Sequence, residues 1–203
     1  MKCILSIFMV AVSIGVAAQA KKDTARLLPE PAGWTFERFS LPPVFAPNFP
    51  YGGVEELRFS PGMFDKNSIE YFTYAFAAQL NNRRSMSKND ISIYLADYFK
   101  GLCGKTAKDR KLVIDTSKIT VNIEAKKERG KEIIYNAQLH VFGVFADGAD
   151  VYLNMEVKIL ASTGSKKVYL NFIASPHAKS DAVWNQLYTI QQNFTIPAED
   201  NKP

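Results

Sequence analysis

The chain has 203 residues, a formal net charge of +5, and 47% hydrophobic and 22% charged residues. This length is sufficient for one domain with a substantial hydrophobic core. The positive balance is mild and spread along the chain, whereas a nucleic-acid-binding protein would need a basic stripe or face. With only two cysteines, the fold must be held by its core and not by a disulfide framework.

The N-terminus has the pattern of a secretory signal peptide. Lys2 precedes an almost unbroken apolar run, and Ala18-Gln19-Ala20 supplies small residues at the spacing of a cleavage site. No second long apolar stretch follows, so we expect a soluble periplasmic or extracellular protein without a transmembrane segment after cleavage. The expected segments are a signal peptide (1–20), a flexible leader (21–32) and a single α+β domain (33–197).

The next part of the chain combines aromatic residues with prolines. Residues 34–41 predict an edge strand, because the prolines that follow exclude a central one. Residues 54–59 predict a short strand that ends at Pro61-Gly62. Residues 69–80 favour a buried strand, although their alanines leave a helix as the alternative.

A helix is predicted from residue 87 to residue 103. Ser87 and Asp90 form an aspartate version of the capping box, and apolar residues then recur at helical spacing. Gly101 and Gly104 predict the end of this helix. The apolar stripe predicts that the helix lies on a face of the sheet.

Residues 118–174 alternate with a period of two, which is typical of strands with one buried face. Turn residues at 128–131, 147–150 and 162–165 join four such runs, so we expect an antiparallel meander. Ser180 predicts the start of a second helix. The predicted fold is therefore α+β: an antiparallel sheet containing the meander 118–174, with helices near 87–103 and 180–194 packed on it.

The sequence contains no recognisable catalytic, cofactor or metal motif. Cys103 would need a neighbouring base to act as a nucleophile, and His140 and His177 stand at no spacing that matches a known mechanism. Two histidines and one cysteine without close spacing are not a zinc pattern either. We therefore expect Cys103 to be buried, and we assign no catalytic, cofactor-binding or metal-binding residue.

The aromatic-rich front half contains the candidate binding surface. Aromatic rings can line a groove or recruit a partner, although they can equally fill the core. Glu55 and Glu56 are adjacent on a predicted strand, so they point to opposite faces and cannot form a catalytic dyad. Glu56 and Arg58 share a face, where we expect a surface ion pair. The candidate surface comprises Trp34, Phe36, Arg38, Glu55, Glu56, Arg58 and Phe64.

Two parts of the chain carry a resemblance. The run from Glu55 to Asp65 (EELRFSPGMFD), with WTFERFSLPP upstream and YFTYAF downstream, resembles a family of small exported bacterial proteins of unknown function. This resemblance covers about residues 33–104 and implies no activity, so no functional residue is carried over. The meander and the closing stretch 184–194 are similar to PsbP-like domains, which implies only an antiparallel sheet sandwiched by helices.

Three functions follow as hypotheses. The leading one is a non-catalytic exported domain that binds a protein or a cell-envelope component. The first alternative is a carrier of a small apolar ligand, which requires an internal pocket between the sheet and a helix. The second alternative is a hydrolase-type enzyme that uses Cys103 or a carboxylate.

Overall fold

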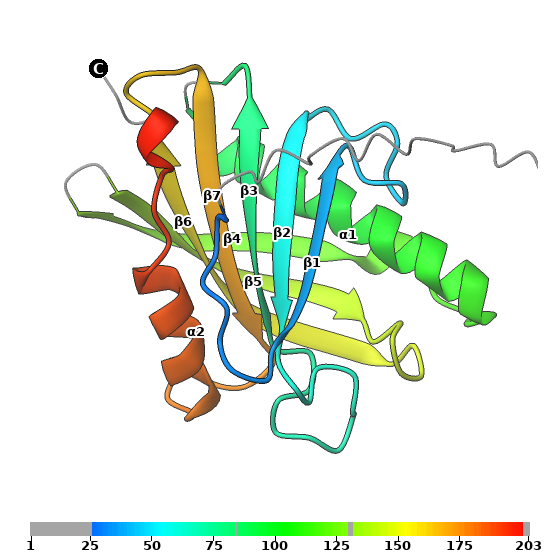
Figure 1. Ribbon diagram of the computed structural model, residues 1–203. Helices are drawn as coiled ribbons and strands as arrows, with labels where there is room; N and C mark the ends of the chain where they lie inside the picture. Colours follow the sequence, from blue (N-terminus) through cyan, green and yellow to red (C-terminus); the bar gives the residue numbers. More distant parts are fainter. Residues whose placement is uncertain (1–25, 84, 130–131, 201–203) are drawn as a thin grey trace, which may run out of the picture.

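The computed structural model describes residues 26–83, 85–129 and 132–200. The expected signal peptide and the first part of the expected leader lie outside the described residues, as do residues 130–131 of the first expected turn. Within them, seven strands form one antiparallel sheet in the order β1-β2-β3-β7-β6-β5-β4 (Figure 1), with two helices packed against it, which confirms the α+β fold. The elements are β1 (Thr35–Leu41), β2 (Gly53–Phe59), β3 (Tyr74–Asn81), α1 (Lys88–Arg110), the 3-10 turn η1 (Thr116–Lys118), β4 (Thr120–Arg129), β5 (Glu132–Phe142), β6 (Asp150–Ala161), β7 (Lys167–Ser175), α2 (Val183–Gln192) and the 3-10 turn η2 (Ala198–Asp200).

The sheet consists of two meanders joined at one seam. Strands β1, β2 and β3 pair in chain order, and β4, β5, β6 and β7 form the meander that the alternation predicts. The seam is the antiparallel pairing of β3 with β7, in which Phe76 lies opposite Phe172. Strands β1 and β4 are the two edges, as expected for β1 from its sequence.

The two helices lie on opposite faces of this sheet. Along β3, Tyr74, Phe76 and Ala78 belong to the core under α1, whereas Ala75 and Ala77 belong to the core under α2. Because successive side chains of a strand point to opposite faces, α1 covers one face, here called the inner face, and α2 the other, the outer face (Figure 1). Helix α2 packs mainly on β7 and β3.

Helix α1 begins where the sequence predicts. The Ser87 side chain accepts a hydrogen bond from the Asp90 backbone N–H at 3.2 Å, and Asp90 Oδ2 accepts one from the Ser87 backbone N–H at 2.8 Å. This reciprocal pair confirms the capping box. The helix buries Ile91, Leu95 and Phe99 on the inner face, as the apolar stripe predicts.

The predicted end of α1 at Gly101 and Gly104 is wrong, because the helix continues to Arg110 and residues 105–110 are helical. Lys111, in the left-handed conformation, is the C-cap. Gly101 has a packing role: a Cβ atom there would lie 2.7 Å from the carbonyl oxygen of Phe45. The small residue lets the helix approach the chain that follows β1.

Three other boundaries differ from the prediction. The strand expected at 69–80 begins only at Tyr74, after a series of turns. The turn predicted at 147–150 is part of a longer connection between β5 and β6, which spans the seven residues 143–149. The cap expected at Ser180 is wrong: the chain makes a further turn, and α2 starts after Ala182 without a side-chain cap. Among the described residues, neither helix has the length and apolar character to cross a bilayer.

Candidate binding site

The residues of the sequence-predicted surface separate onto the two faces of the sheet. Glu55 points into the core beneath α1 and is fully buried. Its Oε1 accepts a hydrogen bond from the Tyr98 hydroxyl at 2.6 Å, and its Oε2 accepts one from the Tyr94 hydroxyl at 3.0 Å. Burial raises the pKa of Glu55 to about 8, although both tyrosine hydrogen bonds act to lower it. Glu55 is therefore closed off from an external partner.

Glu56 points to the outer face and holds the chain that precedes the sheet. Its Oε1 accepts a hydrogen bond from Arg38 Nη1 at 2.5 Å. Its Oε2 accepts the backbone N–H groups of Leu27 at 2.9 Å and Leu28 at 3.1 Å. Groups of the protein itself therefore satisfy most of the hydrogen-bonding capacity of this carboxylate.

Arg58 completes this contact, and we call Arg38, Glu56 and Arg58 the outer clamp. Arg58 Nη2 donates a hydrogen bond to the carbonyl oxygen of Leu28 at 2.7 Å and lies 3.4 Å from Glu56 Oε2. Arg58 Nε donates a hydrogen bond to the carbonyl oxygen of Pro29 at 2.8 Å. Burial lowers the pKa of Arg58, and the Glu56 carboxylate opposes this shift.

The expected surface ion pair of Glu56 and Arg58 is wrong in its location. Both side chains are buried, with 0% and 1% exposure, because residues 27–29 cover them. The end of the expected flexible leader accordingly packs on the sheet, where Leu27 and Leu28 are buried. The residues that sequence analysis grouped on this face do come together, and they bind a segment of their own chain.

The aromatic members of the predicted surface also have intramolecular contacts. Phe36 is 42% exposed, and the guanidinium carbons of Arg26 and Arg58 lie 4.6 and 4.7 Å from its ring centroid. Trp34 Nε1 donates to Gln186 of α2 at 3.0 Å. Phe64 is half exposed and lies apart from the clamp, in the loop after β2. These residues form no continuous exposed surface with Glu55, Glu56 and Arg58, which are buried.

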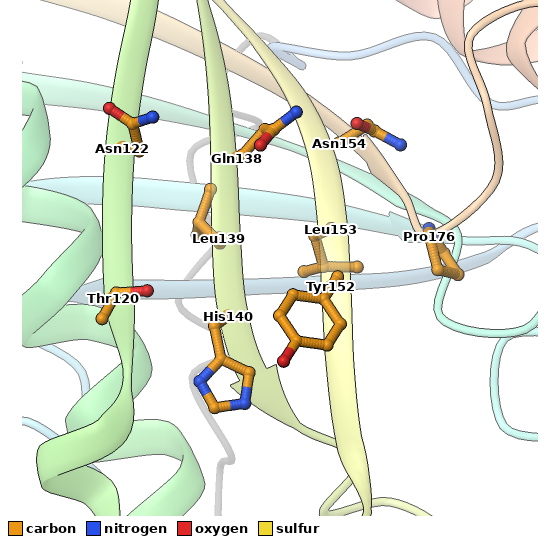
Figure 2. Close-up of a pocket in the computed structure, with 9 residues that line it drawn as sticks. All are labelled: Thr120, Asn122, Gln138, Leu139, His140, Tyr152, Leu153, Asn154 and Pro176. Atoms are coloured by element: carbon orange, nitrogen blue, oxygen red, sulfur yellow. The ribbon is translucent and has the colours of Figure 1, made fainter.

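A different site, which we call the polar groove, crosses β4, β5 and β6 (Figure 2). Its volume is about 320 Å³. The residues that line it include no aspartate, glutamate, lysine or arginine. Their titratable side chains are those of His140 and Tyr152. The groove is lined by Thr120, Asn122, Gln138, Leu139, His140, Tyr152, Leu153, Asn154 and Pro176.

Three carboxamides form a row across the groove. Asn122 of β4 lies opposite Gln138 of β5, and Gln138 lies opposite Asn154 of β6. Figure 2 shows the three side chains one after another across the strands. Because neighbouring strands are about 4.8 Å apart, the carboxamide row extends over about 10 Å.

The row beside it contains Thr120, His140 and Tyr152, which are paired across the same strands. The rings of His140 and Tyr152 are stacked, with centroids 4.9 Å apart and an interplanar angle of 27°. His140 Nδ1 lies 2.7 Å from the Lys118 carbonyl oxygen, and Nε2 lies 2.7 Å from Asp150 Oδ1. The Lys118 carbonyl and the Asp150 carboxylate therefore hold the ring from its two nitrogen atoms. His140 is fixed in this way and supports Tyr152.

The exposed polar groups of the groove are available to a ligand. Tyr152 is 69% exposed, more than the two exposed phenylalanines among the described residues, Phe36 and Phe64. Asn154 Nδ2 donates to the His177 carbonyl oxygen at 3.0 Å, which fixes that carboxamide. Asn122 and Gln138 are exposed, and within residues 26–83, 85–129 and 132–200 their side chains make no hydrogen bond to protein.

The sequence contains one signal for this groove. At one end of the meander, neighbouring positions that face away from the core carry carboxamides and rings, whereas the outward positions further along β6 carry Glu156 and Lys158. Asn122, Gln138, Tyr152 and Asn154 all occupy such outward positions. Only the register places them side by side, and the register depends on the connection between β5 and β6, which is longer than the turn predicted at 147–150.

Cys103 is buried, as expected. Its Sγ lies 3.9 Å from the carbonyl oxygen of Phe142, and burial raises the pKa of the thiol to about 11. His140 bonds to other groups, and His177 Nδ1 lies 3.8 Å from Asp181. Across the part of the chain that the structure describes, no three histidine, cysteine, aspartate or glutamate side chains come together as a metal ion would require.

The comparisons with known proteins were made for the whole chain. No protein-family model matches it, and no curated protein matches it significantly. The function therefore has to be inferred from the polar groove and its surroundings.

Proposed function

We propose that this protein is an exported, non-catalytic domain that binds a cell-envelope component through the polar groove. The observation that carries the proposal is the exposed Tyr152 ring, supported by a fixed His140, beside a row of carboxamides. Export is proposed from the signal-peptide pattern of residues 1–20.

The groove is suited to recognition because the strands fix the backbone positions of its polar residues, and a hydrogen bond to the His177 carbonyl oxygen also fixes the Asn154 side chain. Strands position Asn122, Gln138 and Asn154, and a sheet allows less movement than a loop. Each carboxamide presents both hydrogen-bond donors and acceptors.

The packing beneath α1 favours this proposal over a carrier of a small apolar ligand. A carrier would hold its ligand between the sheet and the helix, and aromatic rings occupy that region. The ring centroids of Phe76 and Phe172 are 4.1 Å apart, and those of Tyr94 and Phe172 are 5.3 Å apart. The buried Cys103 thiol, with its raised pKa, gives the hydrolase alternative little support.

The test is co-sedimentation of the protein, recovered from cells that express the full-length gene, with isolated envelope material. Mass spectrometry of the recovered chain should show the loss of residues 1–20. Tyr152→Ala should reduce binding strongly, whereas Ile69→Ala, which removes an exposed apolar side chain elsewhere, should not. Phe36→Ala tests the surface first predicted from the sequence. Binding that is absent, or that Tyr152→Ala leaves unchanged, would contradict the proposal.

A further inference from the structure

The geometry points to an uncharged glycan as the ligand of the polar groove. This inference rests on the proposed function, because it names the class of envelope component that the groove binds. It is carried by three properties of the site: the exposed ring, the carboxamide row and a lining that contains no aspartate, glutamate, lysine or arginine.

The two rows of the groove match the two kinds of surface that a sugar presents. A pyranose ring has an apolar face of C–H groups and a rim of hydroxyl groups. The Tyr152 ring offers an apolar surface for the first, and its own hydroxyl is a polar group at the edge. Asn122, Gln138 and Asn154 offer donors and acceptors for hydroxyl groups, which themselves both donate and accept.

The spacing of the rows allows one chain of sugars to contact both. Asn154 and Tyr152 are two residues apart on β6, so their side chains emerge on the same face about 7 Å apart. The carboxamide row is about 10 Å long. A site of this size accommodates two or three sugar units, one on the ring and the next along the carboxamides.

The charge of the groove argues against the other common envelope ligands. An anionic polymer or a nucleic acid is recognised chiefly by lysine and arginine, and neither lines the groove. A protein partner would be expected to cover a larger apolar centre than one tyrosine. A neutral ligand also leaves the His140–Asp150 contact, at 2.7 Å, undisturbed.

The experiment is isothermal titration of the recovered protein with neutral oligosaccharides, using cellohexaose, maltohexaose, laminarihexaose and hexa-N-acetylchitohexaose as probes. Alginate and heparin oligosaccharides are the anionic comparison. We expect one or more neutral probes to bind. Tyr152→Ala should weaken that binding about tenfold, and Gln138→Ala about fivefold. Tyr152→Phe should retain most of it, because the ring remains, and Ile69→Ala should match the wild type.

The outcomes separate this inference from the proposed function. If no neutral probe binds while Tyr152→Ala still abolishes envelope binding, the groove remains the binding site and the glycan assignment is wrong. Binding of the anionic probes alone would also overturn the assignment. Binding of a neutral probe that is insensitive to Tyr152→Ala and Gln138→Ala would place the glycan elsewhere and overturn the inference.

Discussion

The buried carboxyl group of Glu55 makes a sharp prediction about stability and pH. Replacing Glu55 by Gln keeps the size of the side chain and one acceptor for the tyrosine hydroxyls, but removes the ionisable group. The carboxyl has a pKa of about 8 in the folded protein and an ordinary value of 4.5. Its contribution to stability is therefore complete below about pH 4.5 and is lost as the pH rises through about 8.

The size of this effect follows from the two pKa values. At 1.36 kcal/mol per pKa unit, the difference between 4.5 and about 8 corresponds to about 5 kcal/mol. We therefore expect the free energy of unfolding of Glu55→Gln, relative to that of the wild type, to rise by about this amount as the pH increases from 4.5 to 8.5. The wild type carries this cost at high pH because it must either ionise a buried carboxyl or unfold.

The assay is urea unfolding of both proteins at closely spaced pH values from 4 to 9, followed by tyrosine and tryptophan fluorescence. The plot of the stability difference against pH should rise through this range and level off above about pH 8. Glu37→Gln, which changes an exposed glutamate of the neighbouring strand β1, is the control and should give a much flatter plot. A flat plot for Glu55→Gln would refute the reasoning, because it would mean that Glu55 ionises as readily in the folded state as in the unfolded one.

The remaining predictions concern the outer clamp, helix α1 and the buried thiol. Glu56→Gln should lower the free energy of unfolding by about 3–5 kcal/mol, because it leaves a buried arginine uncompensated; a loss below about 1 kcal/mol in urea unfolding would contradict this. Gly104→Ala should raise Tm, because the added Cβ meets only a methyl group at 3.6 Å and alanine favours the helix by about 1 kcal/mol. Gly101→Ala should lower Tm because of the 2.7 Å clash, and the opposite order would count against this packing. Cys103 should resist iodoacetamide at pH 8 in the folded protein and react after unfolding, as mass spectrometry of its peptide would report; rapid labelling of the folded protein would show an accessible thiolate.

Local patterns predicted the elements whose formation depends on local interactions. The alternation of Val151, Leu153 and Met155 with polar residues identified β6, because one face of that strand is buried. The Ser87–Asp90 box identified the start of α1, because a cap involves residues that are close in the sequence.

Local patterns did not predict features that depend on residues distant in the sequence. Gly101 and Gly104 are ordinary signals for a helix end, yet the packing of Gly101 against Phe45 and the tertiary contacts of α1 override them. The burial of Glu56 depends on Leu28, which is 28 positions away in the sequence. No local sequence pattern predicts such a contact.

The candidate site illustrates the same limit. Alternation alone shows that Gln138 and Asn154 face away from the core, but it does not show that they are neighbours. A tight turn at 147–150 would have paired these strands in another register. The seven-residue connection between β5 and β6 accompanies the observed register, and this register brings the residues of the groove together.

The seam between β3 and β7 has a consequence for how this chain folds. Residues paired there are separated by between 86 positions, for Asn81 and Lys167, and 100 positions, for Tyr74 and Ala174. Each meander can form from contacts between neighbouring strands, whereas the seam must first close a large loop at an entropic cost. We therefore expect the encounter of the two meanders to limit the refolding rate. In stopped-flow experiments, weakening the seam by Phe172→Leu should slow refolding, and an effect on unfolding alone would show that the seam forms after the rate-limiting step.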